Sequence, residues 1–297
     1  MLKRTIYFSN PAHLSLKDGQ LIYQPIDGEI KTVPVEDLGF VVIENMQISA
    51  TIPLLNALIE NNVAVIFCNE KHLPASMLLN LDGHSIQTEL FAHQINASLP
   101  LKKNLWKQTI EAKIRNQAKL LQKLGKEEKG LIALSRSIKS GDSDNREGQA
   151  ARIYWNQLFG KEFTRDRFGA SPNMLLNYGY TVLRAAIARG LTGSGLLPTL
   201  GIFHHNRYNS FCLADDIMEP FRPFVDRYVF DIYSQKPDVF ILDTEDKLRL
   251  LDVLGSDVVL NKLMRPLLIA VSYTTTSLAR CFSGETSKIL YPEFAST

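Results

Sequence analysis

The chain has 297 residues, of which 45% are hydrophobic and 22% charged, as is typical of a soluble globular protein with a real core. Its three cysteines are too few and too scattered for a disulfide framework or a zinc knuckle, so we expect free thiols in a reducing cytoplasm. The net charge of +2 says nothing about partners by itself, and no signal peptide or membrane-spanning run is apparent, so we expect no membrane partner.

The first seventy-five residues show the alternating pattern of short β-strands. Two Asp-Gly pairs, at 18–19 and 27–28, separate β-rich runs, and this arrangement is a strong hairpin signal. A helix capped by Ser49 is expected to follow, and then a buried strand with the sequence VAVIF. We therefore predict a small N-terminal β-rich domain over residues 1–75 that carries one helix.

The rest of the chain has helical spacing. Residues 76–86 are irregular and are predicted to be a connector, and residues 87–297 are predicted to form a larger all-α-helical domain. Its last two helices are expected at 245–254 and 256–281, and the tail 287–297 is expected to be loose. The predicted fold class is α+β, with the β-rich domain first.

The segment 101–126 is predicted to be an amphipathic helix with a basic outer face. Its apolar stripe consists of Ile110, Ile114, Leu121 and Leu124. Four cations recur on the opposite side, at Arg115, Lys119, Lys123 and Lys126. The surrounding stretch is strongly basic, which suggests a polyanionic partner. The face is therefore either simply solvated or a contact surface for phosphate groups.

A helix is expected to start near Asn145, which places Glu147 in its first turn. Glu147 shares a face with small residues and Tyr154, where a carboxylate needs a partner or a metal. The alternative is a first-turn glutamate that the helix dipole favours. A long buried helix is predicted next, over 171–190, with Asn177 among its polar members.

The stretch 201–225 combines two histidines with clustered carboxylates. His204 and His205 precede Asp216 and Glu219, and these two acids share one face of a predicted helix. Imidazole and carboxylate groups together are what a divalent metal site requires. The alternative is a capping box at the start of that helix, from Asp216 to about Tyr233. Nearby Arg222 could bind phosphate or balance the acidic charge.

Three motifs resemble the CRISPR-associated adaptation integrases, the family of the first of the numbered Cas proteins. They read NREGQAARIYW, SPNMLLNYGYTVLRAAI and LGIFHHNRYNSFCLADDIMEPFRPFVD, and they cover about residues 141–229. The third motif looks most like the members that accompany single-protein effector nucleases, in type II systems. The β-rich start followed by a helical domain agrees with the family's layout.

The resemblance implies a metal-dependent endonuclease and integrase that uses Mg²⁺ or Mn²⁺. The family's catalytic metal ligands correspond here to Glu147, His205 and Glu219, with His205 chosen over His204. His204, Asp216 and Asn177 are possible supporting residues. The DNA-binding residues expected from the basic face and the acidic cluster are Arg115, Lys119, Lys123, Lys126 and Arg222.

The resemblance also implies partners and a reaction. We expect a homodimer formed through the N-terminal domain, a second small CRISPR adaptation protein, and double-stranded DNA as both incoming fragment and CRISPR repeat. A 3′-hydroxyl of the fragment would attack a phosphodiester of the repeat, with a metal ion assisting. The rival interpretations are a non-catalytic DNA-binding scaffold and a small-molecule metal phosphoesterase.

Overall fold

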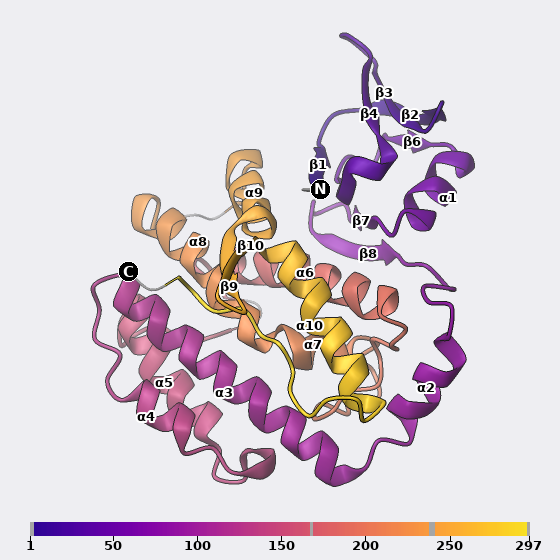
Figure 1. The fold of residues 1–297 in the computed structure, drawn as a ribbon. Helices are drawn as coiled ribbons and strands as arrows, with labels where there is room; N and C mark the ends of the chain where they lie inside the picture. Colours follow the sequence, from indigo (N-terminus) through magenta and orange to yellow (C-terminus); the bar gives the residue numbers. More distant parts are fainter. Residues whose placement is uncertain (1–2, 167–168, 238–240, 296–297) are drawn as a thin grey trace. The chain divides into compact units, whose positions relative to one another are not determined.

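The computed structural model of the chain describes residues 3–166, 169–237 and 241–295 (Figure 1). The chain divides into two compact units, one reaching to His84 and one starting at Ser85. The first unit combines β-strands with the helix α1 (Ile52–Glu60), and the second is mostly helical. This architecture confirms the predicted α+β fold class. None of the described helices is both long enough and apolar enough to cross a membrane.

The N-terminal unit contains two four-stranded sheets. In the first, β1, β5 and β7 are parallel neighbours, and β8 pairs antiparallel with β7. In the second, β3 pairs antiparallel with both β4 and β2, and the short β6 runs parallel to β2. The first sheet comprises β1 (Arg4–Phe8), β5 (Leu38–Ile43), β7 (Ala64–Cys68) and β8 (Pro74–Leu78), and the second β4 (Lys31–Pro34), β3 (Gln20–Pro25), β2 (Ala12–Lys17) and β6 (Ser49–Ala50).

The strands follow from local sequence. The central strand β5 has the wholly apolar sequence LGFVVI. Every one of its residues is buried, as such a sequence favours. Asp18 and Gly19 both have positive φ angles, of 49° and 72°, and connect β2 to β3 as the predicted hairpin. The expected cap at Ser49 is wrong, because Ser49 belongs to β6 and the N-cap of α1 is Thr51.

The expected irregular connector after residue 75 is also partly wrong. Strand β8 runs across that boundary and pairs with β7 at the edge of the sheet. Its first residue is Pro74, and a proline is compatible with the start of an edge strand because no partner there needs its missing N–H group. In the sequence alone, Pro74 suggested a loop. Only the tertiary structure shows that β8 is an edge strand, where a proline is tolerated.

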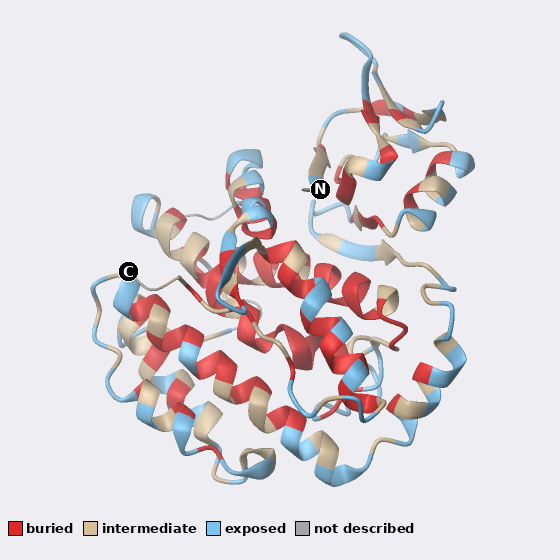
Figure 2. Ribbon diagram, in the orientation of Figure 1, coloured by how far each residue is buried: buried red, intermediate tan, exposed pale blue. Residues whose placement is uncertain are grey.

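The second unit is a helical assembly. Its α-helices are α2 (Gln87–Ile95), α3 (Leu99–Lys123), α4 (Leu131–Arg136), α5 (Arg146–Phe159), α6 (Asn173–Gly193), α7 (Cys212–Met218), α8 (Arg222–Gln235), α9 (Thr244–Leu251) and α10 (Leu267–Phe282). Short 3-10 segments are η2 (Ser140–Asp142), η3 (Glu219–Phe221) and η4 (Asp252–Gly255), while η1 (Val35–Asp37) lies in the first unit. Helix α6 is buried along most of its length and packs against α7, α8, α9 and α10 (Figure 2).

A β-hairpin replaces part of the helix that the sequence predicts at 256–281. Strands β9 (Asp257–Leu260) and β10 (Leu263–Pro266) pair antiparallel, and α10 begins only at Leu267. The turn residues Asn261 and Lys262 both have positive φ, as a tight hairpin turn requires. The β-branched run DVVL and the proline that ends β10 favour strands over a helix here.

The C-terminal tail is packed, so the expectation that it is loose is wrong for residues 287–295. Glu293 forms a β-bridge with Val259 of the hairpin. The hydroxyl of Tyr291 lies 2.8 Å from that of Thr109 on α3, and Asn116 donates to the carbonyl of Pro292. The tail therefore closes the core beside α3, a role that its local sequence does not reveal.

Candidate metal centre

Glu147 lies in the first turn of α5, where capping contacts fix the start of the helix. The Asn145 side chain accepts a backbone hydrogen bond at 3.0 Å, and the Asp142 carboxylate accepts one from the N–H of Glu147 at 3.0 Å. Because these caps satisfy the first backbone donors, the Glu147 carboxylate can turn toward another element. Its Oε1 atom lies 2.5 Å from Nζ of Lys113 on α3.

Glu219 begins η3, in the segment where a helix was predicted from about Asp216. Instead α7, η3 and α8 follow one another directly, and the prolines at 220 and 223 lie in the first turns of η3 and α8. The capping-box interpretation is wrong, because Asp216 lies inside α7 and not at its N-cap. The side chain of Glu219 is only 7% exposed.

Two cations surround the Glu219 carboxylate. Its Oε1 atom lies 2.8 Å from Nε of Arg222, and its Oε2 atom lies 2.6 Å from Nζ of Lys113. Burial alone would raise the pKa of Glu219, but Arg222 and Lys113 outweigh it and hold this pKa below its ordinary value. Glu219 is therefore ionised at neutral pH although it is buried.

Glu147 and Glu219 thus converge on one point, which the Lys113 ammonium group occupies. Burial opposes the charge on Lys113, yet the two carboxylates raise its pKa above the ordinary value. The buried Oε2 of Glu219 has the Lys113 ammonium group, at 2.6 Å, as its cationic neighbour. Two carboxylates directed at one cationic position fit the donor set of Mg²⁺ or Mn²⁺. No three acidic, histidine or cysteine side chains in the described ranges already form a closed metal cluster.

Asp216 organises the histidine loop. This fully buried carboxylate accepts hydrogen bonds from the backbone N–H groups of Ile202 at 2.7 Å, Phe203 at 2.9 Å and His204 at 3.2 Å. Its Oδ1 atom also lies 2.5 Å from Nδ1 of His204. A carboxylate that holds one ring nitrogen of a histidine leaves the other nitrogen for a metal. Asp216 is accordingly placed to orient a ligand.

The structure distinguishes the two histidines. The pKa of His204 is raised, first by its hydrogen bond with Asp216 and also by the charges of Glu219 and Glu147, although partial burial opposes the shift. His204 therefore lies within electrostatic reach of both glutamates. In the part of the chain that the structure describes, the exposed ring of His205 forms no hydrogen bond or ion pair. The geometry favours His204 where the sequence favoured His205.

Close packing fixes the path of this loop. A Cβ atom on Gly201 would lie 2.3 Å from the carbonyl oxygen of His204 and 2.9 Å from Asp216, so only glycine fits there. The Phe203 ring stacks on the buried Trp106 ring, with centroids 4.2 Å apart and planes within 1°. The His204 ring meets both of them edge-on. Trp106 thus belongs to the core.

A second polar cluster borders the same cavity as the site. The buried Asp226 carboxylate accepts hydrogen bonds from the hydroxyls of Tyr154, at 2.6 Å, and Tyr180. Burial raises the pKa of Asp226 to about 6, although these hydrogen bonds oppose the shift. Asp226 lines a cavity of about 220 Å³ together with Lys113, Gln117, Ala151, Trp155, Arg165, Tyr180, Glu219 and Arg222. The predicted supporting residue Asn177 accepts a hydrogen bond at 2.7 Å from Arg165, which lines this cavity.

The four cations of the predicted basic face have different surroundings. Glu293 of the tail lies 2.5 Å from Lys119 and 3.9 Å from Arg115, and so provides the acidic partner that the helix itself lacks. Lys126 donates to the last carbonyls of α5, at Gln157 and Leu158. Lys123 is exposed and forms no hydrogen bond or ion pair within the described residues. Among the described residues, Lys123 is therefore the member of this set whose charge no other side chain or carbonyl engages.

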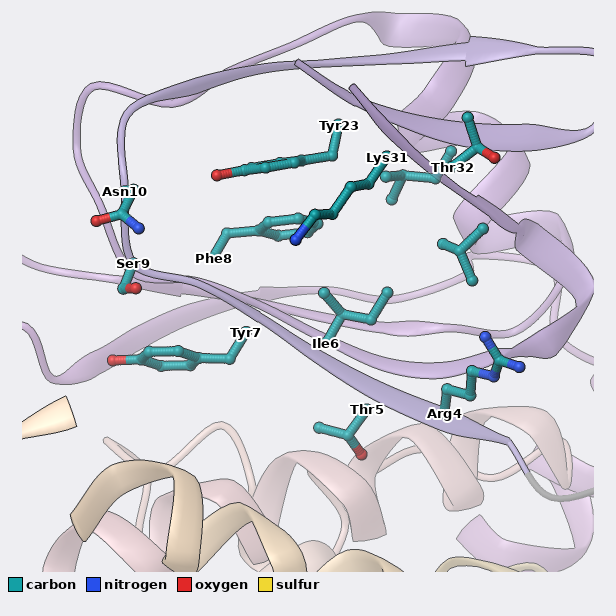
Figure 3. A pocket seen from close by; sticks show the side chains of 12 residues that line it. Arg4, Thr5, Ile6, Tyr7, Phe8, Ser9, Asn10, Tyr23, Lys31 and Thr32 are labelled. Atoms are coloured by element: carbon teal, nitrogen blue, oxygen red, sulfur yellow. The ribbon is translucent and has the colours of Figure 1, made fainter. Parts of the chain in front are cut away.

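The N-terminal unit has a hollow of its own, between β1 and the β3–β4 hairpin. Its volume is about 620 Å³ (Figure 3). The rings of Phe8 and Tyr23 stack there with centroids 5.3 Å apart, and the side chains of Lys31 and Arg4 also line the space. This hollow contains no acidic residue and no histidine, so its side chains lack the ligand chemistry of a metal centre.

Two residues of the site were missed in the sequence. Lys113 lies within the apolar face of α3, three residues after Ile110, and a cation in such a position predicts a buried acidic partner. Asp226 carried no comparable local signal, because its tyrosine partners lie 72 and 46 residues away. A cation within an apolar helix face, such as Lys113, can be recognised from the sequence. A carboxylate whose partners lie far along the chain, such as Asp226, cannot.

Comparison with known proteins identifies relatives that match most of the chain. The family model described as CRISPR associated protein Cas1 matches residues 6–252. A CRISPR-associated endonuclease Cas1 of Neisseria meningitidis serogroup C is 43% identical over 237 residues, which are 79% of this chain and 77% of the relative.

Solved structures share the fold. A casposase bound to its integration product has a TM-score of 0.78 at 18% identity and covers 97% of this chain and 92% of its own. A chain of a Cas6-RT-Cas1–Cas2 complex has a TM-score of 0.71 at 20% identity, over 96% of this chain and 35% of that longer one. At such identities these likenesses show a common architecture alone.

Proposed function

Because this chain belongs to the Cas1 family of CRISPR-associated proteins, we propose that it is a metal-dependent DNA endonuclease and integrase of CRISPR adaptation. It would insert short foreign duplexes into the CRISPR array, by attack of a terminal 3′-hydroxyl on a phosphodiester of the repeat. The observation that carries this proposal is the convergence of Glu147 and Glu219 on one cationic position, beside a histidine that Asp216 orients.

The ligand set that we propose is Glu147, Glu219 and His204, with His204 replacing His205 as the imidazole ligand. A bound Mg²⁺ or Mn²⁺ would supply Lewis-acid chemistry, lowering the pKa of the attacking hydroxyl and stabilising charge on the leaving oxygen. Hard carboxylate oxygens suit both ions, and an imidazole shifts the preference toward Mn²⁺. We therefore expect more activity with Mn²⁺ than with Mg²⁺.

The chain's own residues supply positioning and charge balance. Asp216 holds the His204 ring through Nδ1 and the loop through three backbone groups, so the imidazole does not need to reorganise on binding. Arg222 pairs with Glu219 beside the cavity, where its remaining N–H groups are suited to a DNA phosphate. The reaction needs no covalent protein nucleophile, because the attacking hydroxyl belongs to the DNA.

Partners are proposed on the same basis. The casposase structure is bound to an integration product and another fold relative belongs to a complex with Cas2, which supports double-stranded DNA and a small Cas2-like protein as partners. A homodimer through the N-terminal unit, membership of a type II system and a cytoplasmic location remain predictions from the resemblance.

Strand transfer tests the proposal. A labelled short duplex with free 3′-hydroxyls is incubated with a supercoiled plasmid that carries a CRISPR repeat, with Mn²⁺, Mg²⁺ or EDTA and with or without the small partner. Joined product that requires metal, and that is lost in Glu147→Gln and His204→Ala but kept in His205→Ala, is the expected result. The pair of histidine variants is matched in size and in loop position.

The rival functions predict other results. Metal-independent DNA binding without joined or nicked product would favour a non-catalytic scaffold, and turnover of a small phosphodiester without strand transfer would favour a phosphoesterase. Activity lost with His205→Ala but retained with His204→Ala would overturn the ligand choice alone.

A further inference from the structure

Lys113 occupies the centre of the proposed metal site. It projects from α3 with its side chain 11% exposed, and its Nζ atom lies 2.5 Å from Glu147 and 2.6 Å from Glu219. An ammonium group at these distances binds the same carboxylate oxygens that a metal ion would need. Lysine and metal cannot both occupy this point.

The charges of the site are already balanced without a metal. Lys113 and Arg222 provide two positive charges against the two carboxylates of Glu147 and Glu219, and His204 pairs with Asp216 separately. Without Lys113, Glu147 would lose its close cationic partner and the buried Glu219 would keep only Arg222. This internal cation therefore stabilises the metal-free protein.

We propose that Lys113 is a built-in counter-cation that competes with the divalent metal for Glu147 and Glu219. The inference rests on the proposed function, because it takes these glutamates as metal ligands. Metal binding must displace the ammonium group, and the cavity of about 220 Å³ that Lys113 lines, with Gln117, Arg165 and Arg222, offers space for it.

Displacement makes metal and DNA binding cooperative. A divalent ion that moves the Lys113 ammonium group into this cavity, while Arg222 keeps its place, leaves the site with a surplus of two positive charges. DNA phosphates relieve this surplus, so DNA strengthens metal binding and, by linkage, metal strengthens DNA binding. Free protein accordingly binds metal weakly, which limits nuclease action away from an assembled DNA complex.

The test measures Mn²⁺ affinity by calorimetry and by the electron paramagnetic resonance signal of free Mn²⁺, on the full-length chain with and without a short duplex. The variants are Lys113→Met, Lys113→Arg and, as a matched control on the same helix, Lys107→Met, whose ammonium pairs with Glu111 at 3.6 Å. Lys113→Met should bind Mn²⁺ about tenfold more tightly than wild type without DNA. Lys113→Arg, which keeps the charge, and Lys107→Met should bind Mn²⁺ no more tightly than wild type does.

Thermal unfolding gives a second readout that does not depend on activity. In EDTA, Lys113→Met should unfold at a lower temperature than wild type. Mn²⁺ should raise the unfolding temperature of Lys113→Met by more than it raises that of wild type. Affinity in Lys113→Met equal to or weaker than that of wild type would overturn the inference, and would make Lys113 a residue that aligns the two glutamates. If neither wild type nor Lys113→Met binds Mn²⁺ better than Glu147→Gln does, the proposed metal site itself fails.

Discussion

The carboxylate of Asp216 lies 2.5 Å from Nδ1 of His204 and also accepts the backbone N–H group of the same residue. One buried acid thus fixes both the ring and the main chain of the proposed ligand. The loop from Gly201 to His204 has its shape because Asp216 satisfies its backbone donors, which links the position of the imidazole to helix α7.

Replacing Asp216 with Asn should reduce strand transfer by about 10- to 100-fold, because the amide cannot accept all the hydrogen bonds that the carboxylate accepts. Mn²⁺ affinity should fall in parallel, since the His204 ring loses its orientation. Rate and affinity are measured together on the same protein. Wild-type values for both, in a protein with normal thermal stability, would remove Asp216 from the site.

The stack of Phe203 on Trp106 should matter for activity more than for stability. Phe203 is 46% exposed, so Phe203→Leu sacrifices little burial, but it removes a ring contact of about 0.5–1.5 kcal/mol beside His204. We expect a loss of strand-transfer rate of up to about tenfold with little change in the unfolding temperature. Tyr208→Leu in the same loop, at 79% exposure, is the matched control. Equal effects of the two variants would show that the stack positions nothing.

Alanine substitutions at Lys123 and Lys126 should have different effects, the first on DNA binding and the second on stability. Lys123→Ala removes an exposed cation. The negative slope of log affinity against log salt should therefore become less steep by about one, and stability should stay unchanged. Lys126→Ala removes hydrogen bonds to two α5 carbonyls and should cost about 1–2 kcal/mol of unfolding free energy. DNA titrations over a salt series and urea unfolding measure the two quantities. The reverse pattern would contradict both assignments.

The buried Asp226 should make stability depend on pH in a direction opposite to that of a salt-bridged acid. Burial raises its pKa from 3.8 to about 6, so the folded protein holds this proton more tightly than the unfolded chain does. Its contribution to stability is therefore lost as pH rises from about 4 to 6, by up to about 3 kcal/mol.

Asp226→Asn tests this sign, because the amide cannot ionise. The unfolding free energy of the variant, relative to wild type, should rise between pH 4.5 and 7 and then level off. Urea unfolding across this range measures the difference between the two proteins, which cancels the contributions of other groups. Parallel curves would show that Asp226 titrates near its ordinary value.

The sequence predicted most of what depends on neighbouring residues. The Asp-Gly hairpin between β2 and β3, the amphipathic helix α3 and the start of α5 at Asn145 follow from turn chemistry, periodicity and capping, which act over a few residues. The β9–β10 hairpin was missed because its apolar residues also fit a helical stripe. The packed tail was missed because its partner Thr109 is 182 residues away.

For the site, residue types and spacing in the sequence determined that Glu147, a histidine of the 204–205 pair and Glu219 are candidates for one centre. Only the tertiary structure decided which histidine faces the carboxylates, gave Asp216 its orienting role, and placed Lys113 between the two glutamates. The physical reason is distance along the chain. Lys113 lies 34 residues before Glu147 and 106 before Glu219, and an electrostatic contact between such residues exists only after the helices pack.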